Sequence, residues 1–117
     1  MAVVTDKNVV RPSHGLEFDI LQSGPTGNSG WVDLSSFSAW TLFARNLELG
    51  SVVKIEVTNN VAQPPNNANG AILVAAQAPD TNGCFSFSSL APFHWVRLTK
   101  TQGGTPTVSV ATLHGIY

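Results

Sequence analysis

This chain has little cysteine, little charge and no long hydrophobic run. Its one cysteine, Cys84, cannot form an intrachain disulfide, which excludes a disulfide framework and fits assembly in a reducing cytoplasm. Charged residues make up 11% of the 117 residues, and the six Lys and Arg are scattered, so the basic patch of a nucleic-acid-binding protein is missing. No apolar run approaches the ~20 residues that span a membrane, and the first residues lack the basic and the apolar region typical of a signal peptide. We therefore expect a soluble domain that binds neither nucleic acid nor membrane.

The residue types that carry catalysis or bind metals show no recognisable arrangement. His14, His94 and His114 lack the spacing of a zinc motif. The carboxylates are scattered, and there is no G-x-S-x-G elbow and no phosphate-binding loop. Cys84 stands beside Phe85 in an aromatic segment, which favours a small buried hydrophobe over a nucleophile. The sequence therefore predicts a protein that is not an enzyme and that has no catalytic, cofactor or metal site.

What the chain does contain is alternation of apolar and polar residues, most clearly between residues 30 and 59. Residues 40–45 and 52–58 are expected to form two strands. In the second of them Val53, Ile55 and Val57 share one face, because side chains alternate across a strand. Lys54, Glu56 and Thr58 share the other. This register predicts a dry face and a wet face.

Further segments of strand length follow the same logic. The run at residues 71–76 is apolar throughout, so we expect burial on both faces, whereas residues 23–30 and 59–70 are rich in turn formers and predict surface loops, the second one mobile. Strands punctuated by turns every ~8–12 residues describe a β-sandwich or barrel. We predict an all-β, single-domain antiparallel β-sandwich of about seven or eight strands, jelly-roll-like or immunoglobulin-like. The other expected strands are residues 15–22, 31–34, 84–88, 94–100 and 107–117.

The first thirteen residues form a separate segment before the sandwich domain of residues 14–117. It holds two apolar pairs, and Arg11-Pro12 stops any regular element after them. One interpretation is a frayed terminus or an edge strand of the domain's own sheet. The other is an arm that adds a strand to a neighbouring protein. The arm residues that would make such contacts are Val3, Val4, Val9, Val10 and Arg11.

Three tryptophans in so short a chain need an account. Their ordinary role is to fill the space between two sheets, and Trp40 is the one we assign to the core most firmly. Trp31 follows the Gly-rich loop and is expected to be the most exposed. An exposed tryptophan would allow the alternative role of a stacking platform for sugar rings.

Several short motifs occur in an order that resembles small β-sandwich proteins of tailed-bacteriophage virions. In those proteins a strand, G-x-x-V-x-I-E, a long polar loop, P-x-x-W-V-R-L and then G-G-T follow one another. The resemblance extends over residues 24–115. Its matching segments here are residues 50–56, 92–98 and 103–105, preceded by G-x-x-G-N-S-G at 24–30 and W-V-D-L-S-x-F at 31–37.

The resemblance implies a structural component of the virion, assembled in the host cytoplasm. Such proteins include capsid decoration (cement) proteins, which bind the outer shell and hold neighbouring subunits together, and accessory proteins of the tail or the head–tail connector. The implied partners are the major capsid protein or other virion proteins, and a homo-oligomer, with a trimer favoured. Leu21, Phe43 and Phe93 are candidate contact residues if the core takes the opposite strand faces. The alternative to a structural role is a glycan-binding module for host attachment.

Overall fold

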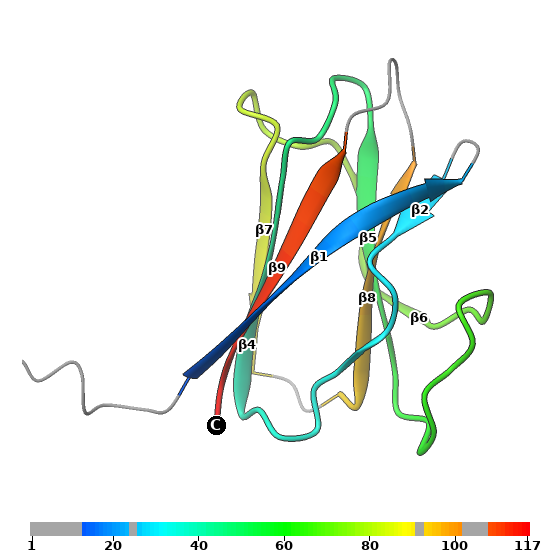
Figure 1. Cartoon of the computed structure of the whole chain (residues 1–117), viewed down its shortest axis with the longest axis vertical. Coiled ribbons are helices and arrows are strands. Elements are labelled where there is room, and N and C mark those ends of the chain that lie inside the picture. Colours follow the sequence, from blue (N-terminus) through cyan, green and yellow to red (C-terminus); the bar gives the residue numbers. More distant parts are fainter. Residues whose placement is uncertain (1–12, 24–25, 91–92, 102–107) are drawn as a thin grey trace, which may run out of the picture.

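The computed structural model describes residues 13–23, 26–90, 93–101 and 108–117; within residues 13–23 it describes side chains for 15–20 (Figure 1). The described chain is an all-β, single-domain antiparallel β-sandwich, as the sequence predicted. Its strands are β1 (Ser13–Ser23), β2 (Thr26–Asn28), β3 (Val32–Asp33), β4 (Ala39–Arg45), β5 (Val52–Thr58), β6 (Ala71–Gln77), β7 (Phe85–Ser89), β8 (Trp95–Thr101) and β9 (Ser109–Ile116).

Two sheets share the long strand β1. The first sheet has the order β1-β9-β4-β7, and the second has β6-β5-β8, with β2 and β3 both paired to the far side of β8. The Ser13 to Ile20 part of β1 pairs with β9, and its last residues, from Leu21 to Ser23, pair with β2. In Figure 1 β1 (blue) accordingly runs diagonally from the strands of the first sheet toward β2. The strand order therefore ends at β6 on one side and at β7 on the other.

The core lies between the sheets and is built from the predicted alternate positions. Trp40, Leu42 and Ala44 of β4 point inward, opposite the inward Val53, Ile55 and Val57 of β5. Burying a side chain of this size contributes about 1.5–3 kcal/mol each. Trp40 is 3% exposed and its ring lies 6.0 Å from that of Phe87, which confirms its assignment to the core.

The run at 71–76 is a strand, but the expectation of burial on both faces was wrong. β6 lies at the edge of the second sheet, and within it Val74 is buried while Ile72 is 54% exposed. Its pairing with β5 shifts register twice, each time with one extra residue on β6. An uninterrupted apolar run is typical of a fully buried strand, but only the strand order decides whether a second neighbour covers it.

Three smaller differences concern a loop, the polar face of β5 and Cys84. The segment 23–30, expected to be loop, contains the short strand β2, which brings the number of strands to nine among the described residues. The expected wet face of β5 carries Glu56, which is 2% exposed. Cys84 was expected to be a small buried hydrophobe at the start of a strand, and it is half-buried just before β7.

Candidate functional site

The outer face of β5 and β8 carries a buried ion pair. Glu56 and Arg97 are opposite each other in register, and the guanidinium donates to Glu56 Oε1 from Nη2 (2.8 Å) and Nε (3.2 Å). The Thr99 hydroxyl donates to the same oxygen over 3.0 Å. Burial by itself raises the pKa of Glu56, but these hydrogen bonds outweigh it and hold that pKa below its usual value of 4.5. The Glu56 carboxylate is therefore bound by side chains of its own fold, Arg97 and Thr99.

Arg97 also fastens the long loop, residues 59–70, over this face. Its Nη1 donates to the carbonyl of Asn66 and its Nη2 to that of Ala68 over 2.9 Å. The guanidinium carbon lies 4.5 Å from the ring centroid of Trp31, a cation–π contact. The loop is exposed over most of its length, as predicted, and this charged group anchors it to the sheet.

The expectation that Trp31 is exposed was wrong, because this arrangement buries it to 5% exposure. The physical reason is that Arg97 holds one ring face and the end of the loop covers the ring, with Gly70 so close that a Cβ there would lie 2.7 Å from Trp31 Cη2. Trp40 is in the core, and half-buried Trp95 stacks on His94 with ring centroids 4.9 Å apart. The sugar platform we had placed at Trp31 is therefore not formed.

A second buried group lies inside the sandwich, where Lys100 of β8 points into the core. Its Nζ donates to Glu48 Oε1 (2.7 Å) and Oε2 (3.1 Å) and to the Ser109 hydroxyl (3.0 Å). The Ser109 hydroxyl in turn donates to the carbonyl of Asn46 over 2.9 Å. Lys100 and Ser109 are both 0% exposed, so this lysine–serine pair offers no atom to a substrate. It joins the turn after β4 to β8 and β9.

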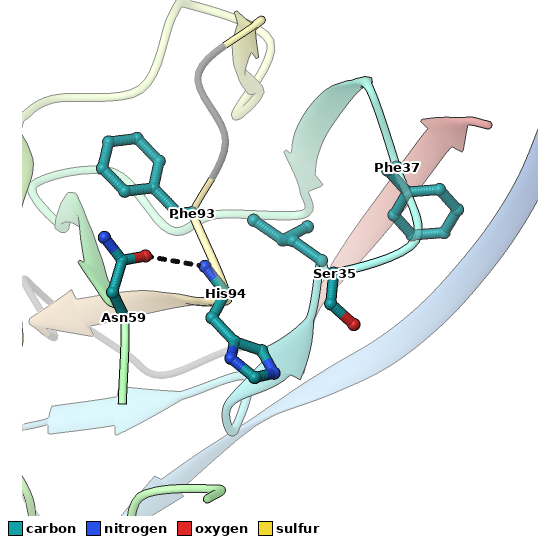
Figure 2. Close-up of a pocket in the computed structure, with 6 residues that line it drawn as sticks. Ser35, Phe37, Asn59, Phe93 and His94 are labelled. Carbon is teal, nitrogen blue, oxygen red and sulfur yellow. Dashed lines mark hydrogen bonds between the residues drawn. The ribbon is translucent and has the colours of Figure 1, made fainter. Parts of the chain in front are cut away.

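A depression of about 310 Å³ opens where the turn before β4, the end of β5 and the start of β8 meet (Figure 2). Its walls are apolar: Leu34, Phe37 and Phe93. Ser35, Asn59 and His94 supply the polar part of the lining. The Asn59 Oδ1 accepts the backbone N–H of His94 over 3.0 Å, which is the dashed line in Figure 2.

Serine, histidine and aspartate meet beside this depression, in an arrangement that does not activate the serine. His94 Nε2 lies 3.7 Å from Asp33 Oδ1. The Ser35 hydroxyl and backbone N–H both bond Asp33, and these bonds, with the nearby His94, hold the pKa of Asp33 below its usual value against a smaller opposing effect of burial. A catalytic triad needs the histidine between serine and aspartate. Here the aspartate lies between the serine and the histidine, so the three residues do not have the order of a triad.

The outer face of the first sheet exposes a large apolar residue. We call it the Phe43 face, after the 36% exposed Phe43 of β4. In register, Phe43 is flanked by Ser86 of β7 and Thr112 of β9. Near one end, Arg45 and Glu17 form an exposed ion pair of 3.2 Å. The residues of the Phe43 face are Thr41, Phe43, Ser86, Ser88, Thr112 and His114.

The predicted contact residues fall in different places. Phe43 is on the face just described, whereas half-buried Phe93 lines the depression before β8. Leu21 belongs to β1, but its side chain is outside the described residues, as are the arm residues Val3, Val4, Val9, Val10 and Arg11. Sequence reasoning missed the two buried ion pairs. Their partners are 41 and 52 positions apart, and the one available signal was Lys100, which lies on the same strand face as the apolar Val96 and Leu98.

Comparisons with protein-family models, with curated proteins and with solved structures found no match for this chain. Within the described ranges, no three His, Cys, Asp or Glu side chains are grouped closely enough to hold a metal ion. The same part of the chain contains no helix of the length and apolarity that crossing a membrane requires.

Proposed function

We propose that this chain is a non-enzymatic structural protein of a tailed-phage virion, and specifically a capsid decoration protein that binds the outer shell through protein–protein contacts. Its partner is then the major capsid protein, and its location is the virion, after assembly in the host cytoplasm. The motifs at residues 50–56, 92–98 and 103–105 support this assignment by their resemblance to virion β-sandwich proteins.

The observation that carries the proposal is how the polar groups are used. The buried charged groups, Arg97 with Glu56 and Lys100 with Glu48, are paired inside the fold. The Phe43 face presents Phe43 among small uncharged groups, with the exposed Arg45–Glu17 ion pair beside them, and the depression at Phe93 has apolar walls. Surfaces of this kind gain free energy by excluding water against another protein, and aromatic residues at their centres contribute most.

Binding of purified protein to undecorated shells of the source phage tests the proposal. We expect Phe43→Ser and Phe93→Ser each to weaken co-sedimentation with the shells by at least about tenfold, the effect of a modest contact residue. Leu49→Ser is the matched control, because Leu49 is 94% exposed and lies on neither surface. Equal weakening in all three variants, or in none, would contradict the assigned surfaces.

The alternative is a tail or head–tail accessory protein. The same experiment separates it from a decoration protein if isolated tails are included. Protein that sediments with tails and leaves the shells bare would move the assignment to the tail.

A further inference from the structure

The two ends of the strand order differ in how well they are protected against further pairing. An edge strand presents unpaired N–H and C=O groups, and proteins commonly block it with charges, proline or bulges. β6 has two register shifts in its pairing with β5, and the extra residues distort its edge. The irregular backbone of β6 therefore makes this edge of the second sheet poorly suited to pair with a further strand.

In β7, at the other end, the described residues show no charge, proline or register shift. It pairs with β4 in unbroken register from Phe85 opposite Ala44 to Ser89 opposite Trp40. The strand is Phe-Ser-Phe-Ser-Ser, without charge and without proline, and it is followed by Leu90, which is 80% exposed. In Figure 1 β7 lies at the outside of the first sheet. Along residues 85–88, the edge that faces away from β4 is regular and uncharged, and no strand among the described residues pairs with it.

The sequence of β7 is complementary to itself. If two copies pair antiparallel about a two-fold axis at Phe87, Ser86 of one copy stands directly opposite Ser88 of the second. Both serines are exposed on the Phe43 face, so their hydroxyls can bond one another across the pair. On the other side of the sheet the two half-buried Phe87 rings meet at the axis, beside the Trp40 ring that each already contacts. No like charges meet along the strand.

We propose that two copies of this chain associate through β7, joining their first sheets into one eight-stranded sheet across a two-fold axis. The interface is isologous, with the same strand contributed by both copies. This inference does not depend on the virion assignment. It gives a dimer where the sequence had led us to favour a trimer.

The register can be tested by disulfide trapping. In a Cys84→Ser background, Ser86→Cys and Ser88→Cys are made as separate proteins, both at exposed positions of β7. Position 86 faces position 88 of the other copy, while like positions are diagonal and too far apart for a disulfide of ordinary geometry. We expect a mixture of the two proteins to give a cross-linked dimer under mild oxidation, and each protein alone to give little. Equal cross-linking of the separate proteins, or none in the mixture, would overturn the proposed pairing.

The association itself is tested by sedimentation equilibrium. We expect the wild type to be a dimer and the double variant Ser86→Lys, Ser88→Lys to be a monomer, because the lysines of the two copies would stand opposite each other. Ser36→Lys with Asn67→Lys is the control, since it adds the same charge at exposed positions away from β7. A monomeric wild type, a β7 variant that remains dimeric, or dimerisation lost on removal of residues 1–12 would each contradict the proposal. If the lysine variant fails to fold, the trapping experiment still decides.

Discussion

Replacing Lys100 by Met is the sharpest test of how this fold is held together. The side chain is 0% exposed, and its Nζ contacts both carboxylate oxygens of Glu48 and the hydroxyl of Ser109. Met has a similar volume, so the change removes the charge and leaves little cavity. The Glu48 carboxylate would then be buried without its cation.

Removing one partner of a buried ion pair costs about 3–5 kcal/mol, because the remaining charge is left in a poorly solvated place. For a domain of this size we expect the midpoint of thermal unfolding to fall by roughly 10–25 °C. Urea unfolding followed by tryptophan fluorescence gives the free energy directly. Lys54→Met is the matched control: Lys54 is half-buried on β5, and within the described residues it has no ion pair, so we expect a change within about 0.5 kcal/mol.

The double variant Lys100→Met, Glu48→Leu completes the thermodynamic cycle. Replacing both charges by apolar groups is often neutral or stabilising, and Ser109 keeps its hydrogen bond to the carbonyl of Asn46. We therefore expect the double variant to recover most of the stability that the single variant loses. A free energy of unfolding for Lys100→Met within about 1 kcal/mol of the wild type would refute the reasoning. A double variant whose loss of stability equals the sum of the losses in Lys100→Met and Glu48→Leu, measured separately, would refute it too.

Three further predictions follow from the same structure. Trp40→Ala should lower the free energy of unfolding by about 3–5 kcal/mol, since the ring is core; a near-neutral change in urea unfolding would contradict this. Arg97→Lys should cost about 2 kcal/mol and speed amide hydrogen exchange at residues 66–70, because an ammonium cannot reach Glu56 and the loop carbonyls together; unchanged exchange there would show that Arg97 does not anchor the loop. Because the pKa of Glu56 is lower in the folded chain, its contribution to stability is present above the unfolded pKa, whose usual value is 4.5, and is lost as the pH falls through the folded pKa. The free energy of unfolding should therefore drop as the pH falls below 4.5, less steeply in Glu56→Gln, and equal slopes would refute this.

The strands were predictable from sequence because alternation and turn residues are local properties. Trp40 to Arg45 and Val52 to Thr58 alternate between core and outer face, and β4 and β5 form where that pattern indicated. Strand order was not predictable in the same way. β6 has the composition of a buried strand, yet it is an edge strand, because its place in the sheet depends on pairings with distant segments.

The candidate site was predicted in part. Phe43 was expected on an exposed strand face, and that is where it lies. Trp31 was wrongly predicted to be exposed because its neighbours in sequence are loop-forming. Its burial is caused by contacts with Arg97 and with the end of the long loop. Contacts of that kind join residues far apart in the chain, and a single sequence contains no local pattern for them.

Electron cryo-microscopy of undecorated shells of the source phage, before and after addition of the purified protein, tests the proposed function most directly. A decoration protein should add density at symmetry-related positions on the outer surface, between capsid subunits, with both the Phe43 face and the depression at Phe93 in contact with the shell. Shells that show no added density at saturating protein concentration would contradict the assignment.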